Sequence, residues 1–303
     1  PKRFLQNLKD MVHADLIYMH SPTNLRILLM PLARLLGKPI LLQWIGTDVV
    51  TVTWNKRPPF YDIGLNQEIP VAEALTAGLY GFPKMMVILT LRFSDIFLAF
   101  LKRYVTHHVA CGQHLVQDLR YAGITADCLP VLNHVSPEAL PFPEKPAFLS
   151  YIGFHSKSDK RNYYGWQSLL RLAKDFPEVS FYVVGRGTSL DVNLPNIIIC
   201  GYVTNIQKIM EKVIGFLRIT YHDGMPRLVM EALALGRYVI YTQKFPNTIY
   251  VTSYYQLREE VQKIMKIKKL NVKGIKVIKN NYNYQTVSNK FISAFETTIE
   301  KHS

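Results

Sequence analysis

Short apolar runs alternate with longer amphipathic stretches along the chain. The apolar runs, which predict buried strands, cover residues 14–19, 40–45, 104–110, 147–152, 180–184, 216–221 and 238–241. Stretches with helical spacing cover residues 4–11, 24–36, 164–175, 228–235 and 284–301. Strands that alternate with helices in this way predict an α/β protein built on parallel sheets.

A proline-rich, polar segment over residues 136–146 (SPEALPFPEKP) separates two sets of strands and helices and predicts an interdomain linker. We expect an N-terminal domain over 1–140, a C-terminal domain over 147–283, and a last helix over 284–303 that crosses back to the first domain. A chain of 303 residues is long enough for two domains with cores of their own.

Residues 216–240 (FLRITYHDGMPRLVMEALALGRYVI) form the most informative stretch. A buried strand is followed by a turn at 222–224, a helix over 228–235 with Pro226 in its first turn, a stop at Gly236 and another strand. Asp223 lies at the carboxyl end of the strand, and Glu231 follows eight residues later. The helix start offers free N–H groups to phosphate or sugar oxygens, and a carboxylate can bind a pair of hydroxyls.

This stretch resembles the acidic-x7-Glu signature of GT-B glycosyltransferases, in particular the retaining family-four enzymes (E-G-F-G-x-x-x-x-E-A-x-A-x-G-x-P-V-I). It differs from that signature at Asp223, at Met225-Pro226 and at Tyr238. The resemblance covers most of the chain and implies two Rossmann-like, doubly wound parallel-sheet domains that face each other across a cleft. It implies that Glu231 binds the ribose of a nucleotide-sugar donor and that Asp223 meets the hydroxyls of the donor sugar.

Further donor-binding positions follow from the same resemblance. Gly153 matches the glycine of a Gly-Arg pair that grips the donor diphosphate, but Phe154 replaces the arginine. Lys160 and Arg161, with Lys157 close by, are the candidates for this phosphate role, and the sequence leaves open which of them binds. The other positions implied to contact the donor are Gly185, Tyr202, Val203, Gly224, Met225, Pro226 and Arg227.

His20 and Asp48 are the candidate catalytic residues of the first domain, since each follows a predicted strand. The alternative for Asp48 is a helix or turn cap, and for His20 a loop histidine bonded to the backbone. Ile45 stands where the resembled family often has a histidine. The first strand and glycine-rich turn usual in such domains are missing, so the sequence is either truncated or a shortened version.

Residues 51–80 are of mixed character, and Trp54, Lys56, Arg57 and Pro58-Pro59 are expected in an exposed loop. Residues 82–102 (FPKMMVILTLRFSDIFLAFLK) approach the length of a membrane span, but Lys84, Arg92 and Asp95 interrupt them. A buried helix of the first domain is the prediction, and a helix lying on a membrane face is the alternative.

The formal charge of +14 favours anionic partners such as nucleotides or acidic lipid surfaces. Three scattered cysteines indicate a reducing compartment, and no signal-peptide pattern opens the sequence. We therefore expect a cytoplasmic protein, with peripheral contact with an anionic membrane as an open point. His107, His108 and His114 do not share a helical face with an acidic partner, so no metal site is predicted.

The resemblance implies an enzyme, a retaining hexosyltransferase that moves a sugar from a UDP- or GDP-linked donor to a glycan or lipid-linked acceptor. Basic side chains would replace a metal ion, so no cofactor and no divalent ion are expected. Two alternatives stay open: a nucleotide-sugar epimerase of the same fold, and a non-catalytic relative that binds nucleotide sugars. A nucleic-acid-binding protein is disfavoured, because no helix-turn-helix, zinc finger or aromatic RNA platform is present.

Overall fold

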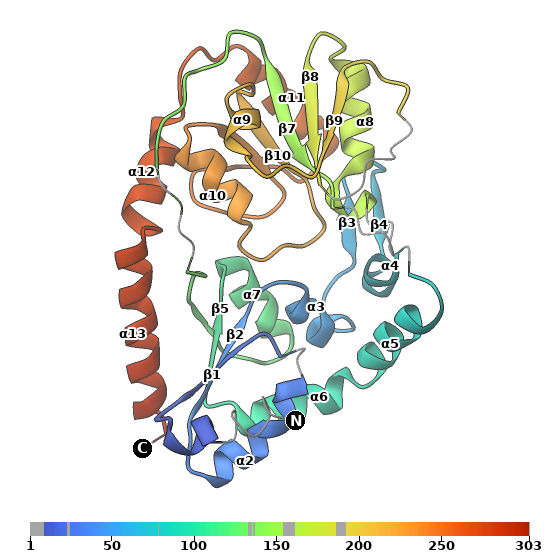
Figure 1. Cartoon of the computed structure of the whole chain (residues 1–303). Helices are drawn as coiled ribbons and strands as arrows, with labels where there is room; N and C mark the ends of the chain where they lie inside the picture. The colour runs from blue at the N-terminus through green and yellow to red at the C-terminus, as the bar shows by residue number, and fades with distance from the viewer. Residues whose placement is uncertain are drawn as a thin grey trace. The chain divides into compact units, whose positions relative to one another are not determined.

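The computed structural model describes residues 9–22, 25–77, 79–132, 135, 137–153, 161–185 and 192–302. Internal contacts divide the chain into two compact units (Figure 1). Unit 1 comprises Pro1–Pro58, Leu89–Leu132 and Tyr284–Ser303, and unit 2 comprises Pro59–Ile88 and Asn133–Asn283. Compared with the expected domains, residues 59–88 group with the second unit and not with the first.

The described strands of unit 1 form one parallel sheet in the order β1-β2-β5-β6. They are β1 (Ile17–His20), β2 (Ile40–Trp44), β5 (His107–Ala110) and β6 (Asp127–Cys128). The helices are η1 (Leu25–Leu29), α2 (Met30–Leu35), α3 (Thr47–Thr53), α6 (Ser94–Tyr104), α7 (Gln113–Tyr121) and α13 (Tyr284–Glu300). Every residue of β2 is buried, which explains why its sequence is apolar without alternation except at Gln43.

Helix α13 lies along one side of this sheet (Figure 1). Its Thr298 hydroxyl lies 2.9 Å from Nδ1 of His107, whose Nε2 lies 2.8 Å from a carboxylate oxygen of Asp127. Near the other end of the helix, the ring of Phe291 meets the ring of Tyr18 edge to face at 5.9 Å. His107 therefore joins β5, β6 and α13 through hydrogen bonds within the fold.

His108, the next residue, is held neutral. The Trp44 indole N–H donates to Nδ1 of His108 at 3.2 Å, which requires that nitrogen to be unprotonated. Burial lowers the pKa of His108 from its usual value of 6.5 to about 4, with smaller contributions from His107 and Lys102. Between about pH 4 and 6.5, His108 is therefore neutral in the folded chain and protonated in the unfolded chain.

We expect this histidine to make stability depend on pH. Its folded pKa lies below the unfolded value, so the stabilisation is complete above pH 6.5 and is lost as the pH falls toward 4. The loss should reach about 3 kcal/mol, at about 1.4 kcal/mol per pKa unit. Urea unfolding followed between pH 7.5 and 4.5 measures it. The variant His108→Gln should flatten this dependence and the exposed control His13→Gln should not; equal slopes in the two variants would contradict the assignment.

The larger sheet of unit 2 is parallel, with its described strands in the order β12-β11-β10-β7-β8-β9. Their bounds are β7 (Ala147–Tyr151), β8 (Ser180–Val184), β9 (Ile197–Gly201), β10 (Gly215–Arg218), β11 (Tyr238–Tyr241) and β12 (Ile249–Tyr250). Strands β8 and β9 follow β7 in the chain and lie on one side of it, whereas the next strand, β10, pairs with the other side of β7. The predicted doubly wound topology is confirmed, and its switch point lies between β7 and β10.

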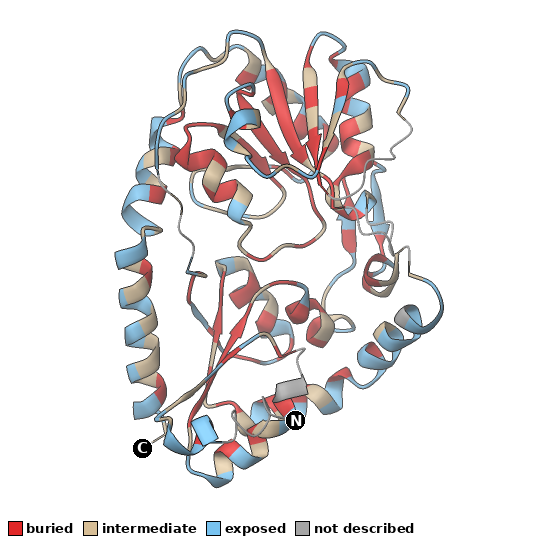
Figure 2. Cartoon of the chain, viewed as in Figure 1, coloured by how far each residue is buried: buried red, intermediate tan, exposed pale blue. Residues whose placement is uncertain are grey.

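Helices cover both faces of this sheet. They are η2 (Asn162–Tyr164), α8 (Trp166–Asp175), α9 (Gln207–Met210), α10 (Arg227–Ala234), α11 (Tyr254–Met265) and α12 (Val272–Asn281). Phe148 and Leu217 pack in the core with α8 and α11, whereas their neighbours Leu149 and Phe216 pack in the core with α9, α10 and α12. Successive side chains of one strand are thus both buried, as Figure 2 shows by the red strands of this sheet.

The predicted loop with Trp54, Lys56, Arg57 and Pro58-Pro59 is confirmed, since residues 54–59 lie outside helices and strands and none of them is buried. The rest of the segment 51–80, for which the sequence predicted no element, is largely ordered. Helix α3 continues to Thr53, and the chain then forms an antiparallel hairpin of β3 (Phe60–Asp62) and β4 (Gln67–Ile69), followed by α4 (Val71–Thr76). The Phe60 ring stacks on the Tyr221 ring at 5.9 Å, and the Tyr221 hydroxyl donates to Asp62. Burial raises the pKa of Tyr221 above its usual value, and the bond to Asp62 adds to this effect. These long-range contacts order a segment whose local sequence has no clear periodicity.

The prediction of one buried helix over 82–102 was wrong. The segment forms two helices, α5 (Gly81–Arg92) and α6, and of the described α5 side chains only Leu91 is buried. The Trp54 indole N–H donates both to the Leu91 carbonyl and to the Ser94 hydroxyl, each at 2.9 Å. The indole N–H thus bonds the Leu91 carbonyl, which in a continuous helix would accept a backbone N–H four residues later. The helix therefore breaks at this point. No helix in the described part of the chain is long and apolar enough to cross a membrane.

Candidate functional site

The candidate site lies at the switch point of the unit 2 sheet, where β7 and β10 are neighbours. Ligands of open α/β sheets bind at such a point, because the loops that leave the two strands turn to opposite faces and open a crevice. β7 ends at Tyr151, two residues before Gly153, and β10 ends at Arg218, five residues before Asp223. The donor positions 153 and 223–231 predicted from the sequence therefore follow the two strands that flank this point.

Arg218 and Asp223 form an ion pair at the end of β10. Nε of Arg218 lies 2.6 Å from Oδ2 of Asp223, and the two side chains are only 9% and 14% exposed. The guanidinium carbon lies 4.9 Å from the ring centre of Tyr151 and 5.2 Å from that of Tyr164. The cation is thus held between a carboxylate and two aromatic rings, an arrangement that stabilises a desolvated arginine.

The surroundings determine the charge of this cluster. Burial opposes the charged form of Arg218, but the carboxylate of Asp223 outweighs burial and raises the pKa of the guanidinium above its usual value. Burial also raises the pKa of the Tyr164 hydroxyl. Asp223 accepts a second bond, from the Gly224 N–H to Oδ1 at 3.0 Å. Both carboxylate oxygens of Asp223 therefore bond within the chain, and the Gly224 N–H that was expected to face the donor bonds Asp223.

Gly153 lies against the same cluster. A Cβ atom at this position would lie 2.4 Å from the Tyr164 ring, so a larger residue would displace that ring. Arg161 lies at the start of the following helical region, where its carbonyl accepts the N–H groups of Tyr164 and Trp166. The predicted phosphate ligands Lys157 and Lys160 lie outside the described residues. Gly185 directly follows β8, and its N–H donates to the Gly201 carbonyl at 2.9 Å.

Helix α10 carries the second predicted carboxylate. Pro226 stands at its N-cap with φ −70°, and no side chain of the described residues caps the helix start, so its first N–H groups are not used by a side-chain cap. Gly236, with φ +80°, ends it in the left-handed conformation that glycine favours. One turn into the helix, Nε of Arg227 lies 2.7 Å from Oε1 of Glu231.

Arg227 and Glu231 line a cavity of about 460 Å³ within unit 2. The other lining residues are Val135, Thr204, Asn205, Ile206, Gln207 and Leu235. The Asn205 side chain accepts the Gln207 N–H at 3.0 Å, which shapes the loop between β9 and α9. Tyr202 and Val203, predicted to meet the nucleotide base, directly precede these lining residues and are not among them. The cavity thus combines a carboxylate, a guanidinium that is 63% exposed, and a polar loop.

The candidate Asp48 of unit 1 lies at the start of α3 and is buried. Its carboxylate accepts the N–H groups of Gly46 at 2.7 Å, Val49 at 3.0 Å and Ile45 at 3.1 Å. Burial raises the pKa of Asp48, against the opposing effect of these N–H groups and of the Ser21 hydroxyl. The geometry is that of a turn and helix cap, the alternative that the sequence left open.

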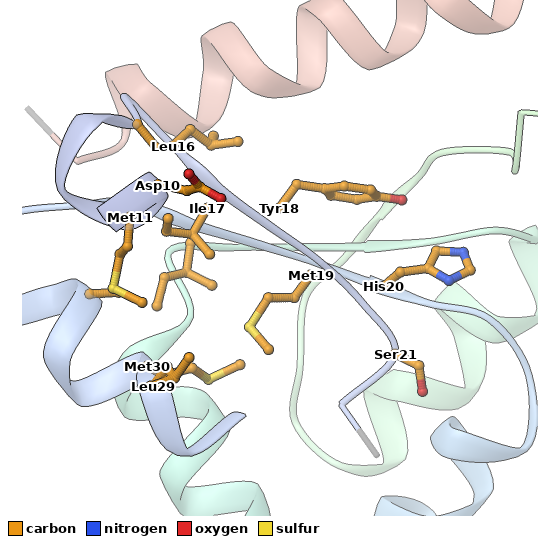
Figure 3. A pocket seen from close by; sticks show the side chains of 13 residues that line it. Asp10, Met11, Leu16, Ile17, Tyr18, Met19, His20, Ser21, Leu29 and Met30 are labelled. Carbon is orange, nitrogen blue, oxygen red and sulfur yellow. The ribbon is translucent and has the colours of Figure 1, made fainter. Parts of the chain in front are cut away.

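His20, the other candidate of unit 1, is exposed at the end of β1. It lines a cavity of about 370 Å³ together with residues of β1, α2 and the helical residues 9–13. Figure 3 shows that Met11, Met19 and Met30 gather on one side of β1, whereas Tyr18 points toward α13. This cavity is mainly apolar and shares no lining residue with the cavity around Glu231. Asp48 is not among its lining residues.

The sequence analysis did not single out Arg218, which lies within the apolar run 216–221. A single arginine in a strand that is otherwise apolar, five residues before a turn carboxylate, was the available signal. Within the described part of the chain, no group of three or more His, Cys, Asp or Glu side chains is placed to hold a metal ion.

No protein-family model matches the chain, and no curated protein matches it in sequence. Its fold, by contrast, is similar to that of solved structures at low identity. HepE of Anabaena, solved in complex with UDP and glucose, has a TM-score of 0.64 at 11% identity, over 97% of this chain and 81% of HepE. The lipopolysaccharide outer core galactosyltransferase WaaB has a TM-score of 0.61 at 13% identity, over 97% of this chain and 78% of WaaB.

TarM of S. aureus is similar over 85% of this chain, with a TM-score of 0.56 at 13% identity, and the match covers 50% of TarM. The chain therefore spans about half the length of that protein. At these identities the comparisons establish the fold, which is the GT-B fold that the resemblance implied.

Proposed function

We propose that the chain is a glycosyltransferase that binds a nucleotide-sugar donor in unit 2 and transfers its sugar with retention at the anomeric carbon. The observation that carries the proposal is the cavity in which Glu231 and Arg227 face the loop 204–207. A carboxylate at 20% exposure can accept bonds from two ribose hydroxyls, and the neighbouring guanidinium and helix start favour phosphate.

Sugar transfer requires that the protein position the donor and place positive charge near its leaving diphosphate. The leaving nucleoside diphosphate carries the charge that develops as the glycosidic bond to the donor breaks, so cations near it lower the barrier. Arg227 and the first N–H groups of α10 supply such charge, and the basic residues of the segment 157–161 add to it. We therefore propose that the reaction needs no divalent ion. Retention is proposed from the resemblance of residues 216–241 to retaining enzymes.

The proposed acceptor is a carbohydrate or a lipid-linked glycan. We place its binding in unit 1, where His20 lines the cavity beside β1. Because Asp48 is buried beneath its own turn, we give it a positioning role for the segment 45–49, and not direct contact with the acceptor.

Calorimetric titration with UDP, GDP and ADP, each with magnesium and with EDTA, tests the donor part of the proposal. We expect one of them to bind at micromolar concentration and its affinity to be the same with EDTA. UDP is the first choice, because HepE, of similar fold, was solved with UDP and glucose. Failure of all three to bind, or binding that requires magnesium, would contradict the proposal. Proton NMR of the product then reports whether the anomeric configuration of the donor is kept.

A second candidate function is a non-catalytic protein that binds nucleotide sugars. It is favoured by Asp223, since both of its carboxylate oxygens are bonded to Arg218 and Gly224 and the donor sugar would have to compete for them. Such a protein would bind the nucleotide as tightly as proposed, yet would release neither free sugar nor glycosylated product from any donor. Nucleotide release above the buffer rate would contradict this candidate.

A further inference from the structure

The hairpin of β3 and β4 packs on the segment that follows β10 in unit 2. Its Phe60, which is 3% exposed, contacts three other rings. These are Tyr221, stacked at 5.9 Å between ring centres, His222 at 6.2 Å, and Tyr163 of η2, edge to face at 6.3 Å. Tyr221 directly precedes the turn 222–224, and His222 is its first residue. The hairpin therefore contacts the turn that carries one of the predicted donor residues.

Asp62 joins the hairpin to Tyr221 through one buried carboxylate. Its Oδ2 accepts the Tyr221 hydroxyl, and its Oδ1 accepts the N–H groups of Gly64 at 2.8 Å and Leu65 at 2.9 Å. The residue is 2% exposed. One carboxylate oxygen thus shapes the loop of the hairpin, and the other holds Tyr221. Because bonds to a charged acceptor are strong, Tyr221 is held at its hydroxyl as well as at its ring.

Helix α8 contacts the loop of the same hairpin (Figure 1). Nη1 of Arg171 donates to the Gly64 carbonyl at 2.7 Å, and Ile63 belongs to the same apolar core as Trp166. A Cβ atom at Gly64 would lie 2.5 Å from the backbone nitrogen of Ser168, so only glycine lets the loop approach the helix this closely. The hairpin is therefore fixed to unit 2 at its loop as well as at its first strand.

Contacts continue from Tyr221 to the ion pair at the end of β10. The Tyr221 N–H donates to the Tyr163 carbonyl at 3.1 Å, and the rings of Tyr163 and Tyr164 meet edge to face at 5.3 Å. The centre of the Tyr164 ring lies 5.2 Å from the guanidinium carbon of Arg218, which pairs with Asp223. The hairpin and the turn carboxylate therefore belong to one connected set of contacts.

The cavity around Glu231 is lined by other residues. Its lining residues come from the loop 204–207, from α10 and its C-terminal end, and from position 135, and none of the residues of the connected set is among them. The proposed donor site therefore has two parts. The cavity is assigned to the nucleoside diphosphate, and the turn 222–224 is assigned to the donor sugar.

We propose that the hairpin β3–β4 positions the turn 222–224 against the sugar of the donor, with Asp62 and Tyr221 as the positioning residues. Their bond keeps the turn ordered before the donor arrives, so less conformational entropy is lost when the sugar binds. A turn that moves would also misplace the sugar relative to its acceptor, and such misplacement slows transfer. The inference rests on the proposed function, because it assigns the donor sugar to this turn.

Calorimetric titration of the variant Tyr221→Phe with UDP and with UDP-glucose tests the proposal. The variant keeps the ring that stacks on Phe60 and loses only the hydroxyl that Asp62 accepts. We expect its affinity for UDP-glucose to fall by about ten-fold, the equivalent of one hydrogen bond to a charged group. Its affinity for UDP should stay within about two-fold of wild type, because the nucleotide binds in the other part of the site. Asp62→Ala should show the same pattern.

The matched control is Tyr254→Phe. Tyr254 also donates its hydroxyl to a carboxylate of unit 2, Oδ2 of Asp175 at 2.9 Å, and that bond joins α11 to α8. The control should bind both ligands as the wild-type chain does. Urea unfolding should show similar losses of stability in Tyr221→Phe and Tyr254→Phe, since each loses one hydroxyl bonded to a carboxylate. A difference between them in UDP-glucose binding would then not come from stability.

Hydrogen exchange without ligand tests the same contact independently of the donor. We expect the backbone amides of residues 221–225 to exchange at least about five-fold faster in Tyr221→Phe than in wild type, and at the wild-type rate in Tyr254→Phe. The proposal is overturned if exchange in this segment is the same in both variants, or if Tyr221→Phe changes the affinities for UDP and UDP-glucose equally. Failure of the wild-type chain to bind UDP, GDP or ADP would instead contradict the proposed function and, with it, the assignment of the sugar to the turn.

Discussion

Replacement of Glu231 by alanine should weaken nucleotide binding by about 100-fold. A hydrogen bond to a charged group contributes about 1.5–3 kcal/mol, so the loss of two bonds to ribose hydroxyls corresponds to at least two factors of ten. The fold should be little affected, because the partner of Glu231, Arg227, is 63% exposed and such pairs contribute at most about 1 kcal/mol. Calorimetric titration of both proteins with UDP measures the effect.

The matched control is Glu260→Ala. Glu260 also pairs with a basic residue on its own helix, Lys263, at 2.6 Å, and is 25% exposed, close to the 20% of Glu231. It lies on α11 and does not line the cavity. We expect it to bind nucleotide as the wild-type chain does. Unchanged affinity in Glu231→Ala, with binding intact in wild type, would mean that the nucleotide occupies another place in unit 2.

Replacement of Arg218 by alanine should destabilise unit 2 by about 3–5 kcal/mol. Removing one partner of a buried ion pair leaves the other charge without compensation in a place that water does not reach. Here the remaining group is Asp223 at 14% exposure, and the rings of Tyr151 and Tyr164 would lose the cation between them. Urea unfolding of Arg218→Ala against wild type measures the free-energy change.

Two further variants make this prediction specific. Arg258→Ala breaks a pair with Asp175 in the same unit, but those side chains are 46% and 35% exposed, so the cost should stay within about 1 kcal/mol. The double variant Arg218→Ala/Asp223→Ala removes the uncompensated charge and should recover part of the loss. If Arg218→Ala costs no more than Arg258→Ala, the pair is not the buried interaction described above.

Arg218 also changes the role expected of Asp223. The resemblance implied that this carboxylate meets the donor sugar. Its bonds to Arg218 and to the Gly224 N–H instead hold the turn 222–224 in place at the switch point. A donor sugar would therefore meet a turn that is already ordered, which lowers the entropy lost on binding.

The sequence by itself determined the elements whose signals are local. The strand Tyr238–Tyr241 and the strand Ser180–Val184 have the predicted bounds, and the helix between Pro226 and Gly236 begins and ends where proline and glycine indicated. Backbone conformation at such positions depends on the residue and its nearest neighbours. A few consecutive residues are therefore enough to predict where these elements begin and end. The pairing of Asp223 and Glu231 with a strand end and a helix follows from the same local pattern.

The tertiary structure decided what depends on partners that are distant in sequence. Asp62 and Tyr221 are bonded across 159 residues, and this contact, not local periodicity, orders the hairpin 60–69, for which the sequence predicted no element. Trp54 ends α5 from 37 residues away by taking the Leu91 carbonyl. Whether an apolar helix is buried or exposed is also such a property, because it depends on whether another surface of the chain covers it. The composition of α5 is compatible with both, and only the packing around Leu91 shows which side faces the protein.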